Sequence, residues 1–257
     1  MKEEKNEMSF LGHLEELRWH LVRSAAAIFI IGILLFVFQK EVFNHFLLAH
    51  RKSDFITYQI FCDFFNLFGM DSTFCNVAFT DNLISLKPTQ QLMTAIWSSL
   101  ILGIILAFPY LLWELWRFIS PGLTKKEVKS SRGFLFIASF LFFCGIAFSF
   151  YVIAPISIHF LYNYKISDVI QNNFTLESHI GLVTNMLLGV SVLFELPVLV
   201  YFLTKIGLVT PEFLKKYRKH SLVVVLILAA IITPPDVASQ VIVAIPILVL
   251  YEISIKV

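Results

Sequence analysis

The chain has 257 residues, of which 58% are apolar and only 15% are charged. A soluble domain averages roughly 45–50% apolar and about 25% charged residues. Most of the surface of this protein is therefore expected to contact lipid rather than water. The net charge of +2 is too small for a phosphate-binding surface, which excludes a nucleic-acid partner. The 27 Phe concentrate in runs without charge, whereas the strands of a transmembrane β-barrel alternate apolar and polar residues. The composition predicts an all-α integral membrane protein.

Apolar runs predict six transmembrane helices, because about 17–25 apolar residues cross a bilayer as a helix. The first four runs cover residues 21–38, 92–113, 133–158 and 180–204. The last two cover residues 220–233 and 237–253 and are short. All six are expected in a single membrane domain over residues 1–257, with a large extracytoplasmic loop at 39–91.

A proline pair divides the last apolar stretch at Pro234, Pro235 and Asp236. Proline removes a backbone donor and clashes with the preceding turn, which favours a hairpin of two short helices. Each arm reaches roughly 20–25 Å at 1.5 Å per residue, less than the roughly 30 Å of the hydrocarbon core. A re-entrant hairpin is the alternative that this length leaves open.

Lysine and arginine predict the orientation. With the N-terminus in the cytoplasm, fifteen of the 20 Lys and Arg residues fall on the cytoplasmic side and five on the other. This is the bias that the positive-inside rule describes. Both termini are therefore expected in the cytoplasm.

Two of the three cysteines, Cys62 and Cys75, lie in the loop that this orientation places outside the cytoplasm, where oxidation is permitted. A bond between them would stabilise the fold by roughly 3 kcal/mol in the chain-entropy model. Two free thiols packed among the aromatic residues of this loop are the alternative. Cys144 lies within a predicted span and is expected to act as a small apolar residue.

No catalytic signature is present. The seven His form no zinc-binding motif, and the chain has no phosphate-binding loop or nucleophile elbow. The sequence therefore predicts no enzymatic activity, no metal site and no cofactor. Histidines near span ends, such as His20, are expected to anchor the helices at the membrane interface.

Three glutamates are candidate functional residues. Glu16 lies in an amphipathic segment before the first span, where the alternative is local pairing of acids with bases such as Arg18. Glu127 follows Thr124 at the spacing of a capping box, which accounts for it without a function. Glu195 lies inside a span, where an ionisable residue indicates a functional site by default. A protonated Glu195 in an interhelical hydrogen bond is the alternative there.

Four segments, taken in this order, resemble the TatC family, the multi-spanning receptor subunit of twin-arginine protein translocases. They are His13-Leu-Glu-Glu-Leu-Arg18, Trp116-Arg-Phe-Ile-Ser-Pro-Gly-Leu123, Phe194-Glu-Leu-Pro197 and Thr233-Pro-Pro-Asp-Val-Ala-Ser-Gln240. Within them, Pro121 and the Pro234-Pro235-Asp236 run mark structural turns. Relatives commonly carry a second basic residue where this chain has Trp19-His20.

The resemblance implies a cup-like bundle in the bacterial cytoplasmic (inner) membrane that binds signal peptides with consecutive arginines. Such a receptor exports folded proteins using the proton-motive force. Glu16 and Glu127 match the family's arginine-binding acids, and Arg18 and Phe118 match neighbouring receptor positions. Glu195 matches the acid that faces small single-span subunits of the TatA or TatB type. Further implied partners are the lipid bilayer and other copies of the receptor in a multimeric assembly.

Two other classes of function compete with the receptor. A proton- or cation-coupled secondary transporter of a small solute would use Glu195 as its coupling site. An intramembrane enzyme would need a second catalytic residue at the depth of Glu195, and the sequence offers none.

Overall fold

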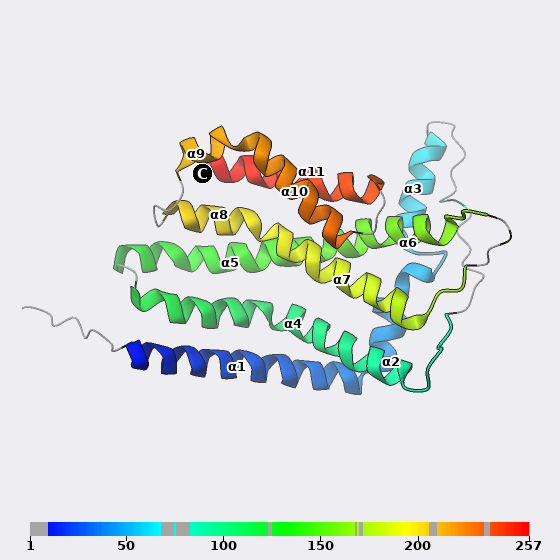
Figure 1. Ribbon diagram of the computed structural model, residues 1–257, viewed down its shortest axis with the longest axis horizontal. Helices are drawn as coiled ribbons and strands as arrows, with labels where there is room; N and C mark the ends of the chain where they lie inside the picture. Colours follow the sequence, from blue (N-terminus) through cyan, green and yellow to red (C-terminus); the bar gives the residue numbers. More distant parts are fainter. Residues whose placement is uncertain are drawn as a thin grey trace, which may run out of the picture.

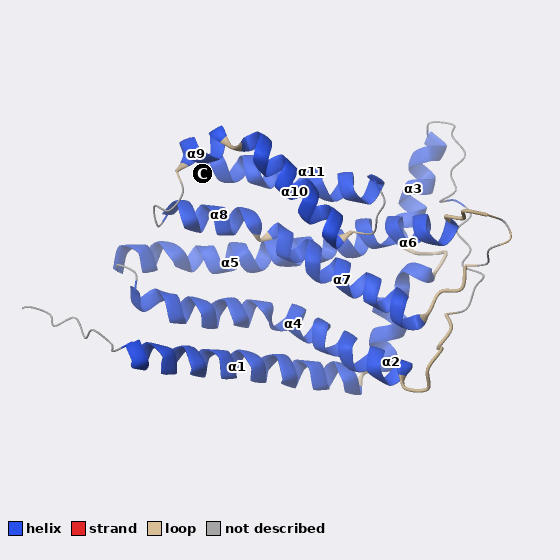
Figure 2. Cartoon of the chain, viewed as in Figure 1, coloured by secondary structure: helices blue, strands red, loops and turns tan. Residues whose placement is uncertain are grey.

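A computed structural model describes residues 10–67, 75, 83–122, 125–167, 169, 172–205, 210–233 and 237–256. Within these ranges the chain is helical and contains no strand, as Figure 2 shows. One isolated bridge pairs Ile84 with Thr175 and joins the two long loops at one end of the molecule. The predicted all-helical class is confirmed for this part of the chain.

Long apolar helices form the body of the molecule. They are α1 (Phe10–Val37), α4 (Gln90–Ile119), α5 (Lys125–Phe148), α6 (Ala154–Asn163), α7 (Leu176–Phe194) and α8 (Leu196–Lys205). Because α5 continues through a π-helical turn into α6, and α7 adjoins α8, four continuous segments within the described residues are long and apolar enough to cross a membrane. These segments are Leu14–Val37, Gln90–Ile119, Gly133–Asn163 and Leu176–Thr204.

The last two helices are shorter in their apolar parts, as predicted. They are α10 (Arg218–Ile232) and α11 (Val237–Lys256), preceded by the short α9 (Pro211–Lys216). The apolar part of α11 is Ser239–Ile253. The turn between α10 and α11, with Pro234, Pro235 and Asp236, lies outside the described residues. The count of six spans stays a prediction.

The first four long helices extend beyond the predicted spans at one or both ends. The first and fourth apolar helices begin at Leu14 and Leu176, and the third continues to Asn163. The second helix runs to Ile119, past the predicted span end at Trp113, because Glu114 and Arg117 do not end the helix. Helix α1 has 28 residues, or about 42 Å at 1.5 Å per residue, so it extends beyond a hydrocarbon core of roughly 30 Å.

The two ends of the bundle differ (Figure 1). One end, here called the α1 end, holds the start of α1, the end of α4, the start of α5 and the C-terminus. The opposite end, here called the cap end, holds α2 (Gln39–Val42), α3 (Ile56–Leu67) and α6. Charged residues at the start of α1 and the end of α4 therefore meet at one end of the molecule.

Glycine allows the long helices to approach each other closely. A methyl group at Gly103 of α4 would lie 2.9 Å from the carbonyl oxygen of Ile28 in α1. A methyl group at Gly145 of α5 would lie 2.7 Å from the Cα of Ser191 in α7. Small residues at such crossings permit the close packing that holds helices together in lipid, where the hydrophobic effect does not act between them.

The cap, residues 39–67, packs on the π-helical turn Ser149–Ile153. The ring of His50 is fully buried, and its Nε2–H donates a hydrogen bond of 2.8 Å to the carbonyl of Phe150. The Tyr58 hydroxyl donates a bond of 2.9 Å to the carbonyl of His50, and Phe46 stacks on Phe150 with ring centroids 4.5 Å apart. The described part of the loop predicted between the first two spans therefore packs against the long helices.

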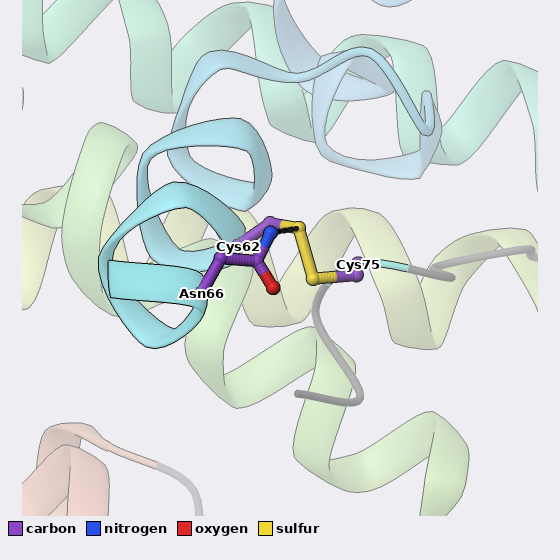
Figure 3. Close-up of a disulfide and its surroundings, with 3 residues drawn as sticks. All are labelled: Cys62, Asn66 and Cys75. Carbon is purple, nitrogen blue, oxygen red and sulfur yellow. Dashed lines mark hydrogen bonds between the residues drawn. A yellow bond between two sulfur atoms is a disulfide. The ribbon is translucent and has the colours of Figure 1, made fainter. Parts of the chain in front are cut away.

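A disulfide joins Cys62 to Cys75 in the structure (Figure 3), with the two Cα atoms 4.8 Å apart. This separation lies within the range of roughly 4.4–6.8 Å found for natural disulfides. The Asn66 side chain donates a hydrogen bond of 3.4 Å to the Cys62 sulfur from the next turn of α3. Cys144 remains a free thiol, as expected.

Burial lowers the pKa of the His50 imidazole to about 4, although the hydrogen bond to Phe150 acts in the opposite direction. The unfolded chain binds a proton at His50 below about pH 6.5, whereas the folded chain does not until about pH 4. The stability that neutral His50 contributes is therefore complete above pH 6.5 and is lost as the pH falls toward 4. The maximum loss is about 3 kcal/mol.

We predict that His50→Gln makes the unfolding temperature less sensitive to pH between 7.5 and 5. The Gln amide can still donate to the Phe150 carbonyl but does not titrate. Thermal unfolding of the purified protein in detergent, measured across this range for both proteins, tests the prediction. Parallel pH profiles would contradict it, because all other titrating groups are shared.

Candidate functional site

The α1 end contains a buried polar cluster between α1 and α4. The Nδ1–H of His20 in α1 donates a hydrogen bond to the Glu114 carboxylate in α4. Glu114 is only 1% exposed, and it also accepts a bond of 2.9 Å from the Tyr110 hydroxyl. The Arg117 guanidinium lies 3.4 Å from the same carboxylate. A buried carboxylate with three donors is satisfied, so this cluster joins the two helices without an unpaired charge.

Helical spacing brings these groups together. Tyr110, Glu114 and Arg117 follow one another at four and three residues, so they lie on one face of α4. The same face meets α1, whose residues Glu16 and His20 are also four apart. Each helix therefore presents a row of polar side chains to the other at this end, where the chain leaves the apolar part of the bundle.

A cavity of about 400 Å³ opens beside this cluster. It is lined by Glu16, Trp19, His20, Arg23 and Arg117. Glu16 is half-buried, and Arg117 lies over the Trp113 ring at 4.9 Å from its centroid. The cavity thus combines one accessible carboxylate with two guanidinium groups and aromatic surface.

The structure places the predicted receptor residues as follows. Glu16 lines the cavity, and Phe118 lies edge-on to His20 with ring centroids 6.1 Å apart. Arg18 is exposed on α1 and is not among the residues that line the cavity. Glu127 belongs to the start of α5, at the same end of the bundle, but its side chain lies outside the described set. The pairing of two acids at one site therefore stays a prediction.

The turn between α4 and α5 begins as a short 3₁₀ turn over Ser120–Gly122, which includes Pro121. A short connection keeps the start of α5 close to the end of α4. This turn is the reason that Glu127 returns to the end of the bundle that holds Glu16.

Glu195 lies in the break between α7 and α8, two residues before Pro197. Pro197 lacks a backbone donor, which accounts for a break in the helix at this point. The Glu195 Oε1 atom is buried and has no hydrogen-bond partner within the described residues. Neighbouring Phe194 packs against Gly145 of α5, so the break is held against a second long helix.

Sequence reasoning missed the two central residues of the α1 end. His20 was expected to anchor α1 at the membrane interface, but it is 7% exposed and is bonded to Glu114. Glu114 was not singled out, because the second span was expected to end at Trp113. The spacing of Tyr110, Glu114 and Arg117 is the signal that indicates a polar face on a continuing helix.

Metal binding has no support in the described ranges, where no group of three or more His, Cys, Asp or Glu side chains could hold an ion.

The fold and this cavity define a polytopic helical membrane protein with a charged recess at one end of its bundle. The family model described as Sec-independent protein translocase protein (TatC) matches residues 12–246. The chain belongs to the TatC family.

Relatives and solved structures agree with this assignment. The chain is 40% identical to the Sec-independent protein translocase protein TatC of Blattabacterium, over 99% of this chain and 96% of that protein. It is 38% identical to the TatC of Helicobacter pylori strain J99, over 95% and 86% of the two chains.

A crystal structure of the twin arginine translocase receptor TatC, determined in DDM, superposes with a TM-score of 0.72 at 32% identity. The match covers 95% of this chain and 98% of that one. These relatives are named as translocase proteins, so the alternative of a small-solute transporter has no support from them.

We predict that His20 and Glu114 stabilise the fold as a pair. Replacing either one with Ala leaves a buried polar partner unsatisfied, which costs roughly 1–3 kcal/mol. The double variant should lose less than the sum of the two, by about 1 kcal/mol or more. Thermal unfolding in detergent of both single variants and the double variant measures this coupling.

Glu114→Gln is the matched control, because the amide oxygen can still accept from Tyr110 while the amide NH2 can donate to Nδ1 of the other neutral His20 tautomer. It should lose less stability than Glu114→Ala. Additive single effects would show that the two residues act independently.

Proposed function

We propose that this protein is the signal-peptide receptor and a core component of a twin-arginine translocase, which exports folded proteins using the proton-motive force. Membership of the TatC family supports this function at the level of the whole chain. The observation that carries the proposal is the half-buried Glu16 carboxylate in the cavity at the α1 end. An accessible carboxylate at this end of the bundle can form an ion pair with a basic side chain of a peptide.

Glu16 and Glu127 bind the two consecutive arginines of the signal. Arginine presents a planar fork of donors that pairs with a carboxylate through two parallel hydrogen bonds, and lysine has no such geometry. Two guanidinium groups therefore need two separate acids. Glu16 lines the cavity, and Glu127 belongs to the first turn of α5 at the same end of the bundle.

The basic residues of the cavity determine on which side of the recess the signal arginines bind. Arg23 and Arg117 line the same recess as Glu16, and like charges repel a second guanidinium. The signal arginines are therefore held on the Glu16 side, away from Arg117. Trp19 lines the recess and supplies apolar surface beside Glu16, and Phe118 lies edge-on to His20. Arg18 is exposed on α1 and lies outside the recess lining.

The α1 end faces the cytoplasm in this proposal. The distribution of Lys and Arg supports it, since the positive-inside rule places the richer side in the cytoplasm. Both termini are then cytoplasmic, and the cap with its disulfide faces the oxidising side of the bacterial inner membrane. The protein works with small single-span subunits of the TatA or TatB type and with other copies of itself.

Glu195 contacts the transmembrane helix of a small single-span subunit. A buried carboxyl oxygen without a partner is unfavourable inside a membrane, and Glu195 Oε1 is in that state among the described residues. A polar side chain on a partner helix would satisfy it.

We predict that Glu16→Ala and Glu127→Ala each weaken binding of a twin-arginine signal peptide by about tenfold or more, because each loses a charge-assisted bond. The double variant should be weaker still. A Lys-Lys signal should lose most of its affinity for the unchanged protein. Titration of a labelled signal peptide against purified protein in detergent measures these constants.

Glu15→Ala is the matched control, because Glu15 is the exposed neighbour of Glu16 and does not line the cavity. It should bind the signal as the unchanged protein does. Undiminished binding by the Glu16/Glu127 double variant would reject the receptor site.

We predict that Glu195→Ala loses crosslinking to the single-span subunit while signal binding at the α1 end persists. Glu195→Gln should retain partial export, because the amide keeps the shape and the hydrogen bonding of the side chain. Full crosslinking by the Ala variant would contradict the contact. Equal inactivity of Gln and Ala would indicate a proton-coupling role instead.

A further inference from the structure

Helix α3 has a row of apolar side chains that remains exposed. Ile56, Ile60 and Leu67 follow one another at four and seven residues, so they lie on one face of the helix. Each is more than half exposed, and the exposed fraction reaches 83% at Leu67. Phe64 lies beside them and is also exposed. These four residues, here called the α3 stripe, form an apolar surface outside the long helices.

The other faces of α3 differ from the stripe. Thr57 and Tyr58 are buried against the bundle. Gln59, Asp63 and Asn66 are exposed and follow one another at four and three residues, so they form a polar row roughly opposite the buried residues. The α3 stripe lies between the buried face and this polar row. A helix that sorts its exposed residues into an apolar and a polar face is typical of the boundary between lipid and water.

The contacts of α3 with the third long segment set its depth. The apolar part of that segment begins at Gly133, directly after Arg132. The Thr57 hydroxyl donates a hydrogen bond to the carbonyl of Tyr151, which is eighteen residues farther on, or about 27 Å at 1.5 Å per residue. A hydrocarbon core is roughly 30 Å thick. The first turn of α3 therefore lies near the end of the core, whereas the long segment continues to Asn163.

The direction of α3 keeps the rest of the helix near this level. In Figure 1, α3 runs across the direction of the long helices at the cap end and projects away from α6. Its 12 residues span about 18 Å. Further hydrogen bonds hold its first turn, because the Tyr58 hydroxyl donates to the His50 carbonyl at 2.9 Å and lies 3.4 Å from that of Pro155. A helix that lies across the bundle at this depth lies in the plane of the membrane surface.

The composition of α3 indicates what kind of surface it binds. Asp63 is its only charged residue, and the helix has no Lys or Arg. Interfacial helices that depend on anionic lipids carry basic residues on their polar face. Burial of the α3 stripe among acyl chains would instead remove apolar side chains from water, which is favourable whatever the charge of the headgroups.

We propose that α3 is an interfacial helix, which inserts the α3 stripe among the acyl chains of the membrane leaflet at the cap end and keeps its polar row in water. The partner is the lipid surface itself, recognised through its acyl chains and not through headgroup charge. The disulfide is compatible with this arrangement, because Cys62 lies on the side of α3 opposite the stripe. The proposal uses no residue of the α1 end and does not depend on the proposed function.

Photocrosslinking of the full-length protein in liposomes tests this insertion. The photoreactive residue p-benzoylphenylalanine, which forms bonds to nearby C–H groups, replaces either Ile60 in the stripe or Asp63 in the polar row. Ile60→p-benzoylphenylalanine should form lipid adducts, detected by mass spectrometry, at about tenfold the yield of Asp63→p-benzoylphenylalanine, because only the former is surrounded by acyl chains. The yield at position 60 should be equal in phosphatidylcholine liposomes and in phosphatidylglycerol liposomes.

Ile30 provides the positive control, because it lies in the apolar part of α1 and is 68% exposed. The same replacement there should form lipid adducts. Adducts at position 30 but not at position 60 would overturn the proposal, as would equal yields at positions 60 and 63. A crosslink between two copies of the protein at position 60 would also overturn it, because the stripe would then bind a second copy. A yield that rises with anionic lipid would contradict recognition through acyl chains.

Discussion

The membrane interior supplies no hydrogen-bond partners, and the architecture of this protein follows from that constraint. Backbone groups are satisfied within long helices, which approach each other where Gly103 and Gly145 leave room for the neighbouring backbone. Side chains are constrained in the same way. Each polar group among the helices must be paired inside the chain, be turned to an end of the bundle, or be left for a partner. The distribution of polar residues is therefore informative about function.

Polar side chains gather at three depths, and their degree of satisfaction differs. At the α1 end, Glu114 has three donors and serves the packing of α1 on α4. At the α7–α8 break, Glu195 retains a buried oxygen without a partner among the described residues. Nearer the cap end, the Thr94 hydroxyl of α4 is also buried without a partner among the described residues. The satisfied cluster therefore differs from the two buried atoms that the described part of the chain leaves unpaired.

In the cap, which lies outside the long helices, polar side chains are buried and paired within the chain. His50 is fully buried and donates a hydrogen bond to the Phe150 carbonyl. Tyr58 is almost fully buried and donates one to the His50 carbonyl. The disulfide and the Ile84–Thr175 bridge fasten the surrounding loops. The Ile84–Thr175 bridge joins the segments that precede α4 and α7.

Features that depend on local pattern could be predicted from the sequence. Apolar run length indicated the long helices, and the position of Cys62 and Cys75 in one loop indicated a possible disulfide. Contacts between distant segments came from the three-dimensional structure. His20 and Glu114, which share a hydrogen bond, are 94 positions apart. Periodicity identifies the face on which a residue lies, but the partner of that face is chosen by helix packing, which depends on the whole chain at once.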